Sequence, residues 1–185
     1  EKFSPDIIGI GTMTINYSEA IQLAKKIKYR KKIPIIIGGP HISTLPQSME
    51  SFFDVGVIGE GEETFLDLIK LYLKKRKFII RDLKKIKGIV FFNKGHIIQN
   101  SKRKEIDLDD LPLPDLNFLN PEYFFKKEIP GSNFILRKGY IITSRSCPYN
   151  CKFCLTSHFW GKLRLDSPKY IALLIKSLVK EHKVT

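Results

Sequence analysis

The chain has 185 residues, and its 32 basic and 19 acidic side chains give it a formal net charge of +13. Twenty-five of the basic residues are lysines spread along the sequence. A lysine-rich composition explains this pattern at least as well as a phosphate-binding groove, so nucleic acid is the less favoured partner. No apolar run approaches the roughly 18 residues that a membrane-spanning helix needs. The absence of a signal peptide and the clustering of the cysteines favour a reducing cytoplasm.

The first 76 residues alternate apolar runs with amphipathic segments. Buried strands are predicted at residues 6–10, 33–37 and 55–58, and helices at residues 17–32, 48–53 and 62–75. The last helix has acidic residues in its first turn and lysines in its last turn, as the helix dipole favours. Strands that alternate with helices predict an α/β fold with a parallel sheet covered on both faces.

Each predicted strand is followed by a loop that contains glycine. The three loops are Gly11-Thr12-Met13-Thr14, Gly38-Gly39-Pro40-His41 and Gly59-Glu60-Gly61-Glu62-Glu63. Ligands of parallel sheets bind at the carboxyl ends of the strands, and glycine lets a bulky ligand approach the backbone closely. Tight turns between strand and helix also need glycine, so the glycines alone leave both explanations open.

In this order, the segments Pro5-Asp6-Ile7-Ile8-Gly9-Ile10, Ile37-Gly38-Gly39-Pro40-His41 and Val57-Ile58-Gly59-Glu60-Gly61-Glu62-Glu63 resemble the cobalamin-binding domain that precedes the barrel in many radical S-adenosylmethionine (SAM) enzymes. The resemblance implies a Rossmann-like domain over residues 1–80 that holds the corrin and its nucleotide tail. The residues implied as cofactor-binding are Gly11, Thr12, Gly38, Gly39, Pro40, His41, Gly59, Glu60 and Gly61. The cobalt-binding motif Asp-x-His-x-x-Gly of the methionine synthase type is absent, because no histidine has an aspartate two residues before it. A lone loop histidine such as His41 is more often a surface or hydrogen-bonding residue than a metal ligand.

Residues 81–138 are predicted to connect two domains. Apolar residues at 88–92 and 97–98 flank Asn93-Lys94-Gly95-His96, which predicts a β-hairpin with a glycine turn. Residues 106–115 contain two prolines and four aspartates, which disfavour helix and strand interiors. An extended, solvated linker is expected there rather than a metal site.

The three cysteines of the chain, Cys147, Cys151 and Cys154, lie within eight residues. Thiolates in such a cluster hold soft metals or iron–sulfur clusters. Three cysteines leave one iron of a four-iron cube without a protein ligand, and an open position at a metal is where a substrate can bind. Zinc bound by the three cysteines and His158 is the alternative. The apolar segment Tyr140-Ile141-Ile142-Thr143-Ser144 argues against zinc, because it predicts a buried strand that leads into the cysteine loop.

The motif Cys147-x-x-x-Cys151-x-Phe153-Cys154, with its lead-in Ser144-Arg145-Ser146, resembles the signature of radical SAM enzymes. The resemblance implies that the cysteines bind a 4Fe-4S cluster, whose open iron chelates SAM and whose electron cleaves it to a 5′-deoxyadenosyl radical. Phe153 would pack beside the cluster and Arg145 would tune its charge. It further implies that residues 139–185 begin a TIM-like barrel, and that a flavodoxin or ferredoxin supplies the electron.

The sequence therefore predicts a radical SAM enzyme with a cobalamin-binding domain, and methyl transfer or ring formation as its reaction. The substrate, a small molecule or a molecule of the lipid or pigment type, is not identified by the sequence. The chain starts at Glu1 and ends at Thr185 after one predicted helix, residues 167–182, so a fragment of a longer protein is expected. The alternative is a zinc-stabilised basic module that binds nucleic acid through its charge, with Cys147, Cys151, Cys154 and His158 as the zinc ligands.

Overall fold

The computed structural model of the chain describes residues 3–120, 125–128 and 135–184. It divides into two compact units, residues 1–105 with 149–161, and residues 106–148 with 162–185. Part of the predicted connector, residues 121–124 and 129–134, lies outside the described residues. The domain limits expected from the sequence stay predictions.

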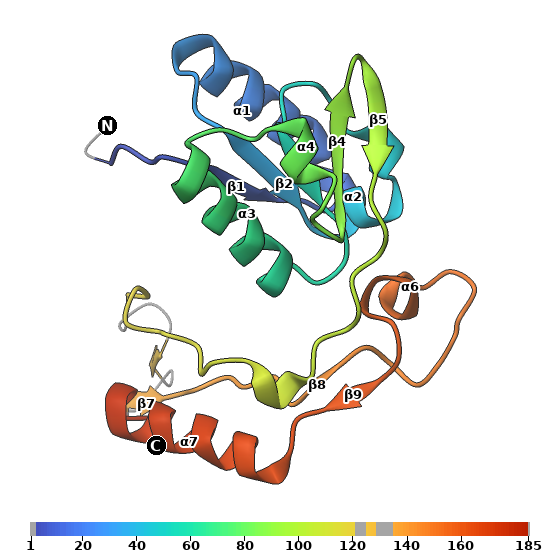
Figure 1. The fold of residues 1–185 in the computed structure, drawn as a ribbon. Helices are drawn as coiled ribbons and strands as arrows, with labels where there is room; N and C mark the ends of the chain where they lie inside the picture. The colour runs from blue at the N-terminus through green and yellow to red at the C-terminus, as the bar shows by residue number, and fades with distance from the viewer. Residues whose placement is uncertain (1–2, 121–124, 129–134, 185) are drawn as a thin grey trace. The chain divides into compact units, whose positions relative to one another are not determined.

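The first unit is built on one five-stranded sheet with the strand order β1-β2-β3-β4-β5 (Figure 1). Its strands are β1 (Ile8–Gly11), β2 (Ile35–Gly38), β3 (Val55–Val57), β4 (Ile89–Asn93) and β5 (His96–Gln99). Strands β1, β2 and β3 are parallel, whereas β4 is antiparallel to β3 and β5 is antiparallel to β4. The α/β fold expected from the sequence is confirmed, with a sheet that is mixed rather than wholly parallel.

Both faces of this sheet are buried, because successive residues of a strand pack into two different apolar clusters. Ile35 and Ile37 of β2 belong to a core cluster with Tyr17, Ala20 and Ala24 of α1 (Tyr17–Arg30). Ile36, between them, belongs to a second cluster with Leu68 of α3 (Glu62–Lys75). Helices α1 and α3 therefore cover opposite faces (Figure 1). Continuous apolar runs such as Ile35–Ile37 are typical of strands buried on both sides.

The remaining helices of the first unit are short. They are α2 (Pro40–Thr44), α4 (Ile80–Leu83) and α6 (Thr156–Trp160), together with 3-10 turns at Thr14–Asn16 and Pro46–Ser48. The helix predicted over residues 48–53 is wrong, because Ser48 ends the 3-10 turn and residues 49–53 form no helix. The α-helix between β2 and β3 is α2, Pro40–Thr44. Proline suits the first helical position, where its missing N–H costs no hydrogen bond.

The predicted hairpin is confirmed, and its two strands are the last two of the five-stranded sheet. Lys94 and Gly95 both have positive φ, 49° and 83°, as a two-residue hairpin turn requires. Strand β4 pairs with β3 through Gly56 opposite Val90 and Val57 opposite Ile89. The buried side chains of β4 supply both core clusters, which makes the hairpin part of the folded sheet.

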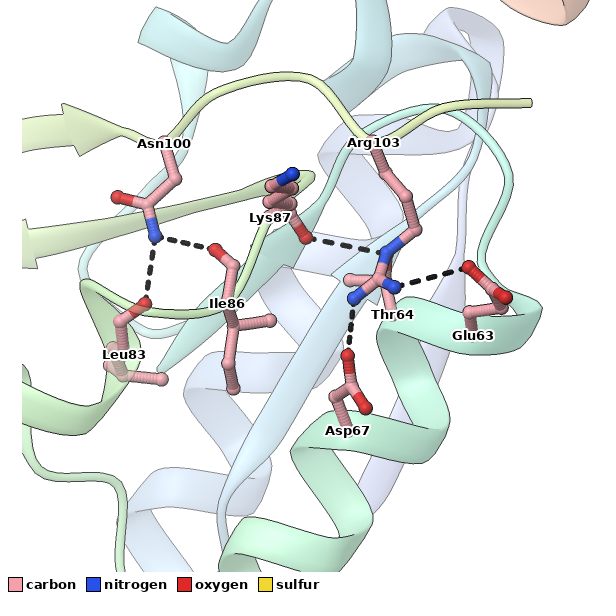
Figure 2. Close-up of polar contacts among 8 residues, drawn as sticks. All are labelled: Glu63, Thr64, Asp67, Leu83, Ile86, Lys87, Asn100 and Arg103. Atoms are coloured by element: carbon pink, nitrogen blue, oxygen red, sulfur yellow. Dashed lines mark hydrogen bonds and ion pairs between the residues drawn. The ribbon is translucent and has the colours of Figure 1, made fainter. Parts of the chain in front are cut away.

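Polar contacts fix the chain where it leaves the hairpin (Figure 2). The Asn100 side-chain amide donates to the carbonyl oxygens of Leu83 and Ile86 at 2.7 and 2.6 Å. Arg103 donates to Thr64 Oγ1 at 2.9 Å and forms ion pairs with two carboxylates of α3, those of Glu63 and Asp67. These contacts attach residues 100–103 to the first unit.

The second unit contains short strands and one long helix. Its elements are β6 (Lys126–Glu128), β7 (Ile135–Arg137), β8 (Ser144–Arg145), β9 (Arg164–Leu165) and α7 (Pro168–His182), with a 3-10 turn at Leu108–Asp110. Ser167 caps α7 by accepting a hydrogen bond from the Tyr170 amide, which confirms the predicted helix. The strand predicted over Tyr140–Ser144 is present only from Ser144. Before Ser144, the Thr143 carbonyl oxygen accepts a hydrogen bond from the Asp166 amide at 3.0 Å, whereas Tyr140 and Ile142 are exposed.

Candidate functional site

The three glycine-bearing loops meet at one edge of the first unit's sheet. Strands β1, β2 and β3 are parallel, so their carboxyl ends lie together, with Gly11 in register with Gly38. We call residues 11–14, 38–41 and 59–61 the three-loop edge. The arrangement expected from the sequence is confirmed, because these segments follow the three parallel strands directly.

Thr12 joins the first loop to the second. Its side chain is buried, and its hydroxyl and its backbone amide both donate to the Gly38 carbonyl oxygen, at 3.2 and 2.9 Å. In return, the His41 amide donates to the Thr12 carbonyl oxygen at 3.2 Å. Thr12 therefore acts inside the edge, holding two loops at a fixed spacing.

Ser43 joins the second loop to the third. Its hydroxyl donates to the Gly39 carbonyl oxygen at 2.9 Å and accepts from the Gly59 amide at 2.9 Å. Through Thr12 and Ser43, the three loops form one hydrogen-bonded unit. Ser43 is not among the residues predicted from the sequence, because no helix is predicted over Pro40–Thr44. The Gly-Gly-Pro start was the available signal.

Gly39 is needed by the protein's own backbone. Its φ is +97°, and a Cβ atom at this position would lie 2.5 Å from the Thr12 carbonyl oxygen and 2.8 Å from the Thr12 nitrogen. L-residues disfavour this φ, and the nearby atoms are backbone that cannot easily move. Gly39 therefore permits the close approach of the first two loops, which explains this glycine without a ligand.

The other four glycines of the edge leave space around their backbone. A Cβ atom at Gly11 or Gly59 would meet no atom within 4 Å, and one at Gly61 would meet only Val57 at 3.8 Å. Gly38 is similar, with its nearest neighbour at 3.7 Å. The loops thus expose backbone that a large flat ligand could approach, and in this respect the edge fits a corrin. Pro40 and Glu60 lie half-buried beside these glycines.

His41 is buried, with 6% of its surface exposed. Its Nδ1 lies 3.1 Å from Thr14 Oγ1 and its Nε2 lies 3.0 Å from Ser48 Oγ. Its ring stacks on Tyr17, with 3.9 Å between the ring centroids. Burial lowers the pKa of His41 and so favours the neutral ring. With both ring nitrogens engaged, His41 offers no free nitrogen to a metal in this structure and connects the first loop to the Pro46–Ser48 turn.

The three cysteines are free thiols. Hydrogen bonds with the side chain and backbone of Thr156 lower the pKa of the Cys154 thiol, whose sulfur lies 3.2 Å from the Thr156 hydroxyl oxygen. Cys151 is exposed and Cys147 and Cys154 are half-exposed. Thiols that can lose their proton fit the donor set of an iron–sulfur cluster or zinc.

The possible metal ligands among the described residues do not lie together. Across residues 3–120, 125–128 and 135–184, no three side chains of cysteine, histidine, aspartate or glutamate are close enough to share a metal ion. This holds equally for the iron–sulfur set and for the zinc set with His158, which is exposed on α6. Phe153 is 94% exposed, so its predicted packing beside a cluster is not formed without one.

The described helices also bear on membrane association. None of them combines the length and the apolar character that crossing a bilayer requires. This agrees with the absence of long apolar runs in the sequence.

Comparison with known proteins gives the edge a family context. Residues 1–69 match the B12 binding domain, and this range contains all three loops. An uncharacterised methyltransferase of Pyrococcus horikoshii is 32% identical over 167 residues, which cover 88% of this chain and 34% of the relative. The bacteriochlorophyllide d C-8(2)-methyltransferase of Chlorobaculum tepidum is 29% identical over 96% of this chain and 33% of its own length. The chain thus spans about a third of the length of these curated relatives.

A solved structure agrees with the fold. The radical S-adenosylmethionine methyltransferase TsrM from Kitasatospora setae, with cobalamin and a [4Fe-4S] cluster bound, matches with a TM-score of 0.64. The match covers 97% of this chain and 36% of TsrM at 17% identity, which supports the fold alone. Together with the match over residues 1–69, this likeness places the three-loop edge in a segment similar to the B12 binding domain, within a fold shared with TsrM.

Proposed function

We propose that this chain is part of a cobalamin-dependent radical SAM methyltransferase, with cobalamin at the three-loop edge and a 4Fe-4S cluster on the three cysteines. One observation carries the proposal. The edge combines loops locked by the protein's own hydrogen bonds with glycine backbone that is open to a ligand at Gly11, Gly59 and Gly61. Loops that are already held in place favour ligand binding, because little conformational entropy is lost when the ligand binds.

The residues of the three-loop edge would have two different roles in binding cobalamin. Thr12, Ser43 and His41 hold the loops in position, whereas Gly11, Gly59 and Gly61 leave space for the ligand. When bound, the cofactors would supply a transferable methyl group and the reductive cleavage of SAM. The chain's own contribution is to orient the cofactor and keep the loops from collapsing into the space. Carbon methylation is the favoured outcome, since the relatives described above are methyltransferases, and ring formation is the alternative.

The cysteine loop would hold the cluster through Cys147, Cys151 and Cys154. The Thr156 hydroxyl would support the Cys154 thiolate, and Arg145, two residues before Cys147, would add positive charge near the cluster. Hydrogen bonds and charge of this kind tune the potential of a bound cluster. A pigment-like or other small-molecule substrate is proposed from the bacteriochlorophyllide methyltransferase. A flavodoxin or ferredoxin is proposed as the electron donor, because the cluster needs one electron to cleave SAM.

Cobalamin binding can be tested at an open glycine. We expect hydroxocobalamin to bind the unaltered chain and Gly11→Phe to weaken binding at least tenfold, because the ring would fill the open edge. His96→Phe is the matched control, since it adds the same ring at an exposed position of β5 outside the three-loop edge. Equilibrium titration followed by absorbance measures both. If the two variants bind equally well, or if the unaltered chain does not bind, the edge is not a cobalamin site.

Cluster binding needs a separate test, so that one half of the proposal can fail alone. Anaerobic reconstitution with iron and sulfide should give a brown protein that absorbs broadly near roughly 400 nm, as thiolate-bound clusters do. Alanine at Cys147, Cys151 or Cys154 should abolish the absorbance, whereas His158→Ala should retain it. Stoichiometric zinc that is lost in His158→Ala would instead support the zinc module.

A further inference from the structure

A dense group of positive charge lies at the end of α1, apart from the three-loop edge. We call it the α1 basic patch: Lys25, Lys26, Lys28, Arg30, Lys31 and Lys32, six cationic side chains in eight residues. Lys28 is neutralised internally, because its Nζ lies 2.6 Å from Asp54 and 3.0 Å from the Ile33 carbonyl oxygen. In the described part of the chain, no carboxylate lies within 4.0 Å of the other five cationic groups.

Helix stability does not account for this charge. One or two cations in the last turn satisfy the negative end of the helix dipole, and Lys28 and Arg30 already do so. Additional like charges three or four residues apart repel one another on a helix. Lys26 and Arg30, neither of which has a carboxylate partner within 4.0 Å in the described part of the chain, stand in this relation. The repulsion indicates that the patch serves a negatively charged partner.

An exposed aromatic ring lies among these charges. Tyr29 is 93% exposed, and on the helix it lies next to Lys25, four residues before it, and close to Lys26. The Lys25 ammonium group lies 5.0 Å from the centre of the Phe52 ring. A shallow hollow is lined by Lys25, Lys26, Lys28, Tyr29, Arg30 and Phe52. The patch thus combines cations with one accessible aromatic face beside a hollow.

The patch is well separated from the proposed cofactor site. Helix α1 starts beyond the three-loop edge and leads back to the amino end of β2. Its 14 residues span about 21 Å at 1.5 Å per residue, so the patch lies at the opposite edge of the sheet. A ligand at the patch would leave the three-loop edge free.

We propose that the α1 basic patch binds single-stranded nucleic acid, with Lys25, Lys26 and Arg30 on phosphates and Tyr29 stacked on a base. Basic grooves with exposed aromatic rings are how proteins bind single strands without reading their sequence. A membrane surface fits less well, because apart from Tyr29 the exposed side chains of residues 25–32 are charged and provide no apolar anchor. An acidic protein would use the charge but would leave Tyr29 without a specific role.

The test is fluorescence anisotropy of a labelled uridylate dodecamer with the full 185-residue chain over a series of salt concentrations. Single strands lose affinity with a logarithmic slope of about −0.7 for each phosphate neutralised, so the three proposed phosphate contacts contribute about −2 to the slope. Changing Lys25, Lys26 and Arg30 to glutamine together should weaken binding at least tenfold and reduce the slope by about two. Tyr29→Ala should weaken binding at least fivefold at an unchanged slope, and Tyr29→Phe should restore it.

A matched control removes the same charge elsewhere. Lys74, Lys75 and Lys77, at the end of α3 and after it, are exposed and lie outside the patch, so changing these three to glutamine should leave most of the affinity. Equal losses in the two triple variants would show binding through total charge alone and would overturn the proposal. The proposal would also be overturned if the dodecamer failed to bind. The same holds if the patch bound phosphatidylglycerol vesicles or polyglutamate more tightly than the dodecamer. Thermal unfolding followed by circular dichroism should show the same midpoint for each variant as for the unaltered chain, because the substituted side chains are exposed.

Discussion

The three-loop edge and the cysteine loop differ in what holds them in place. The edge rests on two buried apolar clusters and is tied together by Thr12, Ser43 and His41. In the cysteine loop, Phe153 is 94% exposed, and Ile142, five residues before Cys147, is 76% exposed. The edge is therefore organised before any ligand binds. We expect the cysteine loop to gain its order from the metal centre it holds, as folding and metal binding are coupled in small metal sites.

This contrast predicts that the apolar core of the first unit stabilises it without any ligand. A substitution of Leu68 should give the largest effect on that stability. Leu68 of α3 is fully buried in the second core cluster. Leu68→Ala should lower the free energy of unfolding by about 3 kcal/mol, the middle of the range for buried leucine. Urea denaturation of the cluster-free protein measures it. Leu66→Ala is the control on the same helix, half-exposed, and should cost less than about 1 kcal/mol. Similar losses at the two sites would mean that the first unit has no well-packed core.

Gly39 tests whether the edge itself is rigid. Gly39→Ala should destabilise the protein by about 2 kcal/mol, because the new Cβ would press on the Thr12 backbone at a φ of +97°. Gly11→Ala, in the neighbouring loop with open space around it, should change stability by less than about 1 kcal/mol. Thermal unfolding of both variants decides the point. A Gly39→Ala protein as stable as Gly11→Ala would show that the loops can move apart freely.

The comparison also separates what the sequence could predict from what it could not. Helix α3 was predicted with its observed limits, Glu62–Lys75, because charges of opposite sign mark its two ends. Helix α2 was missed, because five residues are too few to show a helical period. That β4 joins the sheet beside β3 could not be read from a local pattern, since strand pairing depends on distant residues. The run Ile89-Val90-Phe91, buried on both faces, was the available sign of an inner strand.

The site was predictable to a similar degree. Loops at the ends of parallel strands could be located, because topology brings strand ends together. The roles within them could not be assigned. Gly39 and Gly11 look alike in the sequence, yet the first is enclosed by backbone and the second is open. The hydrogen bonds of Ser43 and His41 depend on a helix that the sequence analysis did not place. The ligand role of the cysteines stays a prediction that rests on their spacing.

Arg103 gives a smaller effect at the boundary of the first unit. Its side chain is 22% exposed and bonds the buried Thr64 hydroxyl as well as Glu63 and Asp67 (Figure 2). Arg103→Met should lower stability by about 1 kcal/mol, since its carboxylate partners are partly exposed and Thr64 loses a donor. Arg76→Met removes an exposed ion pair with Asp6 and should have almost no effect. Hydrogen exchange should show faster opening of residues 100–103 in Arg103→Met only. Equal rates of hydrogen exchange at residues 100–103 in the two variants would mean that Arg103 does not attach this segment to the first unit.

The smallest effect should come from the protonation of His41. Burial lowers the pKa of His41 in the folded protein, so the unfolded chain binds its proton more readily. Folding therefore loses stability as the pH falls through the unfolded pKa of about 6.5, and the loss continues down to the lower folded pKa. His41→Gln keeps side-chain hydrogen-bonding groups but cannot take up a proton in this range. The free energy of unfolding of the unaltered protein should therefore fall relative to that of His41→Gln as the pH is lowered from 7 to 5, roughly the interval in which histidine titrates. Urea denaturation at both pH values measures it, with His96→Gln as the exposed control. A difference that stays constant with pH would mean that His41 is as accessible to protons as an exposed histidine, and that the three-loop edge opens readily in solution.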